Sequence, residues 1–219
     1  MATEQDQPLL LDYWRSSASY RVRIALALKG IEHRTNPIDL LAQAHREPGH
    51  LARNPQGLVP VLEIDGLVLT QSLAIVEYLD ETRPDPPLLP FNPAARARVR
   101  ALAYAIAMEI HPICNPSVAM HVEQVAGGGE TMRTEWMRHF IAKGFAAFEK
   151  LLDHPSTGAF CHGNAPGLAD ICLVPQLYNA RRFNLDVSAD PTLAAVETAC
   201  LELEAFRISH PDQQPDAEA

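Results

Sequence analysis

The stretch RSSASYRVR, residues 15–23, indicates more about this chain than any other segment. It follows a strand-like apolar run at residues 9–13 and leads into a helix-like run that closes at Gly30. Ser16 and Ser17 therefore lie where a strand passes into a helix. A helix N-terminus offers unpaired N–H groups and the positive end of a dipole, so it suits an anion such as a thiolate. An isolated serine pair at such a place more often only caps the helix, so both interpretations stay open at this point.

The composition bounds the class of protein. The chain has 219 residues, a formal net charge of −9 and 47% hydrophobic residues, which suits one large domain or two small ones. The acidic balance disfavours nucleic acid as a partner. No apolar run reaches the about 20 residues that span a bilayer, and the first residues carry acids without a basic region. We therefore expect a cytoplasmic protein with no membrane partner.

The cysteines predict neither disulfides nor a metal site. None of the four forms a C-x-x-C pair, and no compact cluster with histidine has zinc spacing. They are Cys114, Cys161, Cys172 and Cys200. We expect buried free thiols in a reducing compartment.

Residues 8–83 alternate between strand and helix patterns. The expected elements are strands at 9–13, 32–38, 59–64 and 67–70, with helices at 17–29 and 73–81, the second capped by Ser72. The segment at 39–53 is polar and irregular and has room for a short helix. Asp65-Gly66 is a signal for a tight hairpin turn. This β-α-β-α-β-β-α order is that of a thioredoxin-like domain. Such domains carry a cis-proline where Val59-Pro60 stands, although an ordinary trans-proline at the start of a strand is the alternative.

A proline-rich linker separates this half from a second one. Five prolines occur in residues 83–93, which predicts a stiff, extended linker at 84–93. Strand patterns nearly vanish beyond it, and we expect an all-helical domain at residues 94–211 followed by a loose tail at 212–219. The expected helices lie at 94–108, 132–152, 168–183 and 192–206, with a kink or break at His111-Pro112. The fold class is thus an α/β thioredoxin-like domain followed by an all-α domain.

This organisation resembles the cytosolic glutathione transferases and, within them, the zeta class, the maleylacetoacetate isomerases. The Ser-Ser-x-x-x-Arg-Val-Arg run is the most class-specific match, and the resemblance covers about residues 8 to 216. The residues that carry it are SSASYRVRIALALKG at 16–30, Asn54-Pro55 before Val59-Pro60, QSLAI at 71–75, ADICLVPQ at 169–176, NARRF at 179–183, LEAF at 203–206 and SHP at 209–211.

The resemblance implies glutathione as cofactor and cis–trans isomerisation of a conjugated, doubly carboxylated diketo acid as the reaction. It implies that a serine hydroxyl donates a hydrogen bond to the glutathione thiolate. Ser17 is the first candidate for this donor and Ser16 is the second. The other glutathione contacts that it implies are the Val59 backbone before Pro60, Gln71 and Ser72 at the γ-glutamyl carboxylate, and His111, Asn115 and Ser117 in a wall of the second domain. Read alone, Ser72 could be a plain N-cap and His111 a helix-end histidine. Between residues 39 and 53 the resemblance assigns no glutathione contact, and Gln43 is only a guess for one.

Arginines should receive the dianionic substrate, because a guanidinium matches a carboxylate in a bidentate way. The family's candidate is Arg182, and Arg15 is the second. Arg181 is better interpreted as a surface residue. We expect Arg21 and Arg23, one turn into the first helix, to make structural ion pairs.

The chain departs from the family pattern at two positions. Ala18 replaces a cysteine of the familiar animal form, so the enzyme's own thiol is absent and glutathione supplies the nucleophile. Gly167 replaces the usual Ser or Thr of a capping box that Asp170 completes. Glycine at an N-cap costs only about a few tenths of a kcal/mol, so we expect a reduced stability margin and an intact function.

Several functions fit the resemblance. The leading one is maleylacetoacetate isomerisation in tyrosine and phenylalanine breakdown. The alternatives are maleylpyruvate isomerisation in gentisate breakdown, general glutathione conjugation, and a non-catalytic assembly module of the same fold. The family also implies a homodimer.

Overall fold

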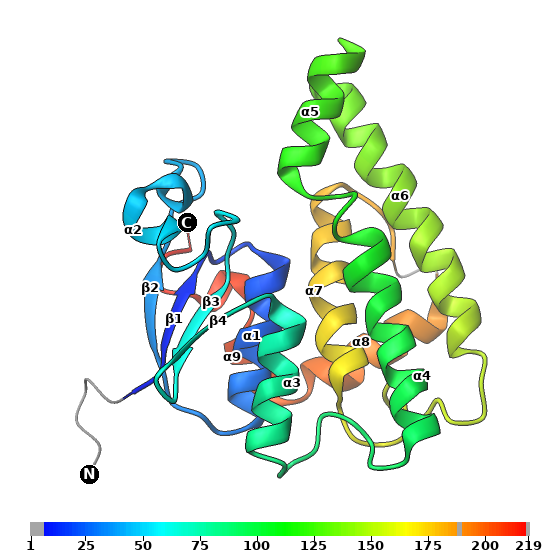
Figure 1. Ribbon diagram of the computed structural model, residues 1–219. Helices are drawn as coiled ribbons and strands as arrows, with labels where there is room; N and C mark the ends of the chain where they lie inside the picture. Colours follow the sequence, from blue (N-terminus) through cyan, green and yellow to red (C-terminus); the bar gives the residue numbers. More distant parts are fainter. Residues whose placement is uncertain (1–6, 188–189, 218–219) are drawn as a thin grey trace. The chain divides into compact units, whose positions relative to one another are not determined.

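The computed structural model describes residues 7–187 and 190–217 (Figure 1). The packing of the chain divides it into two compact units. The first unit holds the residues up to 88 together with those from 202 onward, and the second holds residues 89–201. The division between 88 and 89 falls inside the proline-rich segment that the sequence predicts as a linker.

The first unit contains a four-stranded mixed sheet with the order β2-β1-β3-β4. Strand β1 pairs in parallel with β2 and antiparallel with β3, which in turn pairs antiparallel with β4. Helices α1 and α3 pack on each other and cover one face of this sheet (Figure 1). The elements of this part, in chain order, are β1 (Leu9–Asp12), α1 (Ser17–Leu28), β2 (Arg34–Pro37), a 3-10 turn (Ala44–Arg46), α2 (Pro48–Leu51), β3 (Val61–Ile64), β4 (Leu67–Thr70) and α3 (Ser72–Thr82). This order confirms the predicted thioredoxin-like domain.

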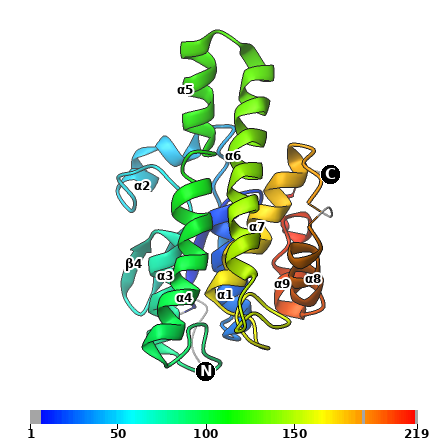
Figure 2. The same ribbon diagram turned by 90° about the vertical axis from the view of Figure 1, so that its right-hand side faces the viewer.

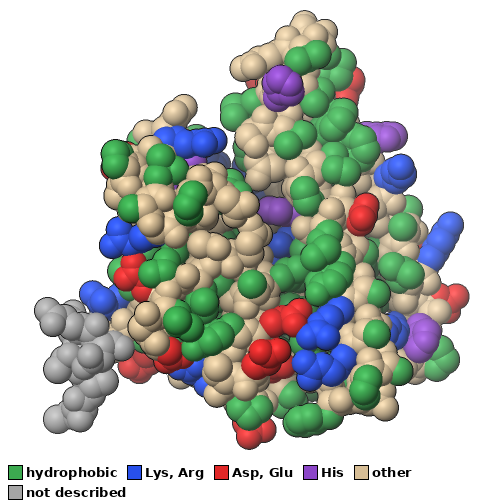
Figure 3. All heavy atoms as spheres, viewed as in Figure 1, with side chains coloured by type: hydrophobic (Ala, Val, Ile, Leu, Met, Phe, Trp, Pro, Cys, Tyr) green, Lys and Arg blue, Asp and Glu red, His purple; other side chains and the backbone are tan. Residues whose placement is uncertain are grey.

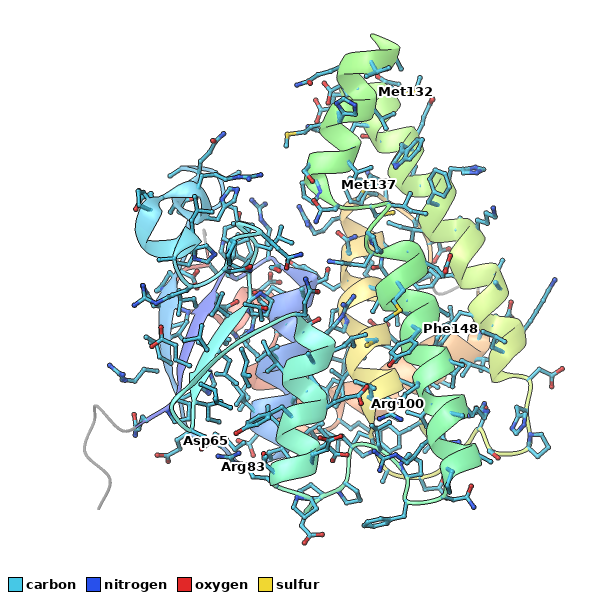
Figure 4. The ribbon with its side chains drawn as sticks, viewed as in Figure 1. Asp65, Arg83, Arg100, Met132, Met137 and Phe148 are labelled. Carbon is cyan, nitrogen blue, oxygen red and sulfur yellow. The ribbon has the colours of Figure 1, made fainter. Side chains whose placement is uncertain are left out.

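The predicted tight hairpin between β3 and β4 is present. Ile64 pairs with Leu67 across the turn, and Asp65 and Gly66 both have positive φ angles, of 53° and 75°. Positive φ at both central residues is the geometry that matches the twist of a hairpin and favours an Asp-Gly sequence. Asp65 also pairs with Arg83 at the end of α3, at an Nη2–Oδ1 distance of 2.8 Å, and the two side chains lie together in Figure 4.

Two X-Pro peptide bonds are cis, Val59–Pro60 and Asp85–Pro86. The first decides between the two interpretations of Pro60 in favour of the cis-proline. Strand β3 begins at Val61, two residues later than the pattern predicts.

The second unit is helical. Helices α5 and α6 run side by side as an antiparallel pair (Figure 2). The described helices of this unit are α4 (Pro93–Tyr104), a π-helical continuation η3 (Ala105–Ile110), α5 (Pro116–Ala126), α6 (Gly129–Leu152), α7 (Leu168–Arg182) and α8 (Pro191–Leu201). The predicted break at His111-Pro112 is present between η3 and α5, and α7 is buried along most of its length, as expected for a central helix. None of the helices in the described ranges is long and apolar enough to cross a membrane.

Helix α5 is absent from the sequence prediction. Its signals are clear in retrospect, because the Asn115 side chain caps it, Pro116 occupies its first position and Gly127 ends it with a φ of 69°.

The C-terminal segment differs from its predicted place in the helical domain 94–211. The predicted helix at 192–206 divides into α8 and a short α9 (Glu204–Ile208), and α9 belongs to the first unit. Buried hydrogen bonds explain this, since the Tyr20 hydroxyl donates to the Phe206 carbonyl and Arg23 Nε donates to the Ser209 carbonyl, at 3.3 and 3.0 Å. In the tail, the Gln214 amide donates to the carbonyls of Ile208 and His210, each at 2.9 Å.

Candidate active site

The register of the sheet gathers the predicted site residues of the first unit at one end. Leu11 of β1 lies opposite Val61 of β3, and Val61 lies opposite Thr70 of β4. The chain leaves β1 toward Ser16, enters β3 from Val59 and leaves β4 toward Gln71. The segments that contain Ser16, Val59 and Gln71 are distant in sequence, but they therefore meet at the same end of the strands, as the resemblance implies. The Asp65–Arg83 ion pair lies at the other end of the hairpin.

Ser16 is the N-cap of α1. Its Oγ accepts the Ser19 N–H at 3.2 Å, and its own N–H donates to the Tyr13 carbonyl at 2.9 Å. The cap bond uses an oxygen lone pair and leaves the hydroxyl hydrogen able to donate to a ligand. The capping and the thiolate-binding interpretations of this serine are therefore compatible.

Ser17 is the first residue of α1 and is buried, whereas Ser16 is half-buried. The N–H of Ala18 has no acceptor among the described residues. The two hydroxyls thus stand beside an open helix N-terminus, where a negative charge is stabilised. Arg15 lies just before them, with its guanidinium 4.6 Å from the centre of the Trp14 ring.

A buried arginine, Arg23, stabilises the turn between β1 and α1. Arg23 donates to both carboxylate oxygens of Asp12, at 2.9 and 2.7 Å, and to the Trp14 carbonyl at 2.9 Å. Arg23 thus makes the predicted structural ion pair. Asp12 was missed at the sequence level, although an acid at the end of an apolar strand is a recognisable signal for a buried partner. Arg21 is also buried and donates to Ser72 Oγ at 3.3 Å, which links the first turns of α1 and α3.

The N-terminus of α3 is open to an anion. Gln71, not Ser72, is its N-cap, and its side chain makes no cap hydrogen bond. The amide of Gln71 instead donates to Gln56 Oε1 at 2.7 Å. Among the described residues, the N–H groups of Leu73 and Ala74 have no acceptor. A carboxylate fits such an end, because it can accept several backbone N–H groups at once.

Val59 offers an open stretch of backbone. It is half-buried, and neither its N–H nor its carbonyl pairs with another backbone group in the described part of the chain. An extended peptide can add to such a segment as a further strand. Taken with the two open helix ends, the first unit fits a tripeptide that carries a thiol and carboxylates.

The other predicted site residues lie in the second unit. Asn115 caps α5, and its Oδ1 accepts the N–H and the hydroxyl of Ser117 at 3.0 and 2.8 Å. His111 lies in the connection just before them. Arg182 is exposed at the end of α7, and its Nη1 donates to Asn179 Oδ1 at 3.4 Å. The remaining guess, Gln43, is exposed next to the 3-10 turn and makes no cap bond.

Arg181 is exposed, as the sequence predicts. Arg181 forms an ion pair with Glu197 of α8 and is therefore engaged in structure. At the start of α7, Asp170 accepts the Gly167 N–H at 2.9 Å and the Cys161 N–H at 2.8 Å. Asp170 thus ties down the helix start without a hydroxyl at position 167.

The protein's own thiols are poor nucleophiles. All four cysteines are free and buried, and burial raises the pKa of Cys114 to about 11. Burial also raises the pKa of Cys161 and Cys200, with the Asp170 carboxylate adding to the shift. With Ala18 beside the serines, a thiolate at this site must come from a bound ligand. The described ranges also hold no group of three or more His, Cys, Asp or Glu side chains arranged for a metal ion.

Comparison with known proteins agrees with this geometry. The profile of the family described as "Glutathione S-transferase, N-terminal domain" matches residues 15–82. The maleylacetoacetate isomerase of Rhizobium meliloti (strain 1021) is 62% identical over 208 residues, which cover 95% of this chain and 98% of that protein.

Two solved structures are similar over nearly the whole chain. One is the holo structure of a maleylpyruvate isomerase, described as a bacterial glutathione S-transferase in the zeta class, with 42% identity and a TM-score of 0.93 over 96% of this chain and all 100% of that one. The other is the maleylacetoacetate isomerase of Methylobacterium extorquens AM1 with bound malonate and glutathione, with 41% identity and a TM-score of 0.92 over the same shares. The chain therefore belongs to the glutathione S-transferase family, in its zeta class.

Proposed function

We propose that this protein is a glutathione-dependent cis–trans isomerase that converts maleylacetoacetate to fumarylacetoacetate in tyrosine and phenylalanine breakdown. The observation that carries the proposal is the pair of serines at the open N-terminus of α1, in a chain whose own thiols are buried. The 62% identity to a maleylacetoacetate isomerase supports the choice of substrate.

Glutathione, when bound, supplies the thiolate nucleophile that a conjugated cis double bond requires before it can rotate. A cysteine thiol has a pKa of about 8.5, so only a few percent is ionised at pH 7. A hydroxyl hydrogen bond from Ser17 or Ser16, together with the Ala18 N–H and the helix dipole, stabilises the ionised form. The same groups hold the sulfur in place, which adds the advantage of proximity.

The ends of the tripeptide have separate receptors. The open N–H groups of α3 and the Ser72 hydroxyl receive the γ-glutamyl carboxylate, and Gln71 flanks them. The backbone of Val59 pairs with the backbone of the cysteinyl residue. The resemblance implies that His111, Asn115 and Ser117 also contact glutathione.

The substrate carboxylates are received by arginines. Arg182 is the first candidate because it is exposed and its guanidinium is held by Asn179. Arg15, stacked on Trp14, is the second. The malonate bound beside glutathione in the Methylobacterium relative supports a dicarboxylate ligand for sites of this class.

The decisive experiment compares maleylacetoacetate and maleylpyruvate as substrates of the purified protein, with and without glutathione. We expect glutathione-dependent isomerisation with a higher kcat/KM for maleylacetoacetate. A higher value for maleylpyruvate would favour the second candidate, which the TM-score of 0.93 to a maleylpyruvate isomerase supports. Conjugation of a chloronitrobenzene without isomerisation would identify a general transferase. If the protein is active in none of these assays, the remaining candidate is a non-catalytic assembly module of the same fold.

We also propose that the protein is a cytoplasmic homodimer. Strand β4 lies at the edge of the sheet, and its Leu67 and Val68 are 45% and 52% exposed. Hydrophobic side chains gather on this face over the hairpin (Figure 3). An exposed apolar edge of this kind is a common contact surface. Light scattering should give twice the chain mass of 24.1 kDa, and a mass equal to one chain would contradict the proposal.

A further inference from the structure

Two buried polar side chains converge on one backbone carbonyl beside the candidate site. His50 Nε2 lies 2.9 Å from the Leu58 carbonyl oxygen, and Asn54 Nδ2 donates to the same oxygen at 2.8 Å. His50 and Asn54 are only 4% and 2% exposed. Leu58 itself is 38% exposed, so burial of its side chain does not hold this backbone in place.

The local fold presents both side chains to the same oxygen. The Asn54 N–H donates to the His50 carbonyl at 2.9 Å, which places the two residues four apart on one helical turn and on one side of it. A carbonyl can only accept, so His50 Nε2 carries the hydrogen. His50 Nδ1 is buried and has no hydrogen-bond partner among the described residues. The ring therefore serves as a single donor directed at Leu58.

This contact sets the direction of the next N–H group. The Leu58–Val59 peptide bond is trans, since the cis bonds of the described chain are Val59–Pro60 and Asp85–Pro86. The C=O and N–H of a trans peptide lie in one plane and point in opposite directions. Two donors that draw the Leu58 oxygen inward therefore direct the Val59 N–H outward, where it has no acceptor within the described chain.

The same loop is tied to the start of α3. Asn54 Oδ1 accepts the Gln56 N–H at 3.1 Å, and Gln56 Oε1 accepts the Gln71 amide at 2.7 Å. Asn54 is thus connected to both backbone segments that the proposed site offers to the tripeptide, at Val59 and at Gln71.

We propose that His50 and Asn54 are positioning residues for glutathione, which fix the Leu58–Val59 peptide plane so that the Val59 N–H meets the tripeptide backbone. The inference rests on the proposed glutathione site. Neither residue touches the ligand, and each acts through the Leu58 carbonyl. Loss of one of the two donors frees this plane to rotate and lowers the affinity for glutathione.

The test uses the full-length protein and variants at position 50. His50→Leu removes the donor, whereas the amide nitrogen of His50→Gln can reach the place of Nε2. Calorimetry with glutathione should give a Kd about tenfold higher for His50→Leu, the scale of one buried hydrogen bond, and a Kd within about threefold of the parent for His50→Gln. The KM for glutathione should follow the Kd, while kcat at saturating glutathione stays within about twofold. His139→Leu, at an exposed position of α6, is the matched control with no expected effect.

Several outcomes would overturn the inference. One is a folded His50→Leu variant that binds glutathione as tightly as the parent, and another is a His50→Gln variant as weak as His50→Leu. If His50→Leu does not fold, Asn54→Asp provides the test, because it keeps the acceptor for Gln56 and replaces the donor to Leu58 by an oxygen. An unchanged Kd in Asn54→Asp would then refute the role. A parent protein that binds glutathione but isomerises neither substrate would contradict the proposed function and leave this binding test intact.

Discussion

The buried pair of Arg23 and Asp12 allows a quantitative prediction of stability. Replacing Arg23 by methionine leaves Asp12, 1% exposed, without the guanidinium that donates to both of its oxygens. Removing one partner of a buried ion pair costs about 3–5 kcal/mol. The carbonyls of Trp14 and Ser209 lose their donor as well, which adds to this cost. We expect the free energy of unfolding to fall by about 4 kcal/mol, a large share of the total for a protein of ordinary stability.

A double variant separates the buried charge from the other losses. Asp12→Leu combined with Arg23→Met removes the uncompensated carboxylate, so only the two carbonyls remain without their donor. We expect the double variant to be about 2 kcal/mol more stable than Arg23→Met alone. Arg133→Met is the matched control, because Arg133 pairs with Glu130 and Glu123 near the surface and its loss should cost less than about 1 kcal/mol.

Equilibrium unfolding in urea, followed by far-UV circular dichroism, measures all three differences. The reasoning is refuted if Arg23→Met costs no more than Arg133→Met. It is equally refuted if the double variant is no more stable than Arg23→Met, because the cost would then not come from the buried charge.

Four further predictions concern the site and the titratable groups. Ser17→Ala should lower kcat by about tenfold or more, which is the scale of losing a positioned hydrogen-bond donor. An unchanged rate would show that Ser16 or backbone N–H groups stabilise the thiolate instead. Arg182→Met should raise KM for the dicarboxylate substrate while Arg181→Met lowers only stability, and equal KM effects would contradict this assignment. Ellman's reagent should label the four buried cysteines only after unfolding, and rapid labelling of the folded protein would show a reactive thiol. Burial lowers the pKa of His33 from its ordinary value of 6.5, so its contribution to stability is complete above pH 6.5 and is lost as the pH falls below it. His33→Gln should flatten this part of the stability profile, and identical profiles would disprove the role.

Much of the first unit follows from local patterns. Apolar runs of strand length, the Asp65-Gly66 turn and the cap at Ser16 each act within a few residues, so their structures are predictable from the chain alone. The isomer of the Val59–Pro60 bond is a different case. Both isomers are accessible to an X-Pro bond, and the surrounding fold selects one of them.

The second unit was harder to predict at its ends. Helix α5 begins and ends with ordinary cap signals, but Pro112, Pro116 and the glycines after residue 126 obscured them. Helix α9 has only five residues, too few to be stable without tertiary contacts. Its place in the first unit depends on hydrogen bonds from Tyr20 and Arg23, each of which lies 186 residues before the carbonyl that accepts its bond.

The class of fold, the family and the serine pair at the first helix are properties of the sequence, because they depend on residue types at short, regular spacings. The arrangement around that pair is a property of the tertiary structure. Asp12 and Arg23 beneath the turn, and His50 and Asn54 on the Leu58 carbonyl, became visible only once the strands were paired and the loops closed. A buried polar group must find its partner wherever the fold places one, and no local pattern records where that will be.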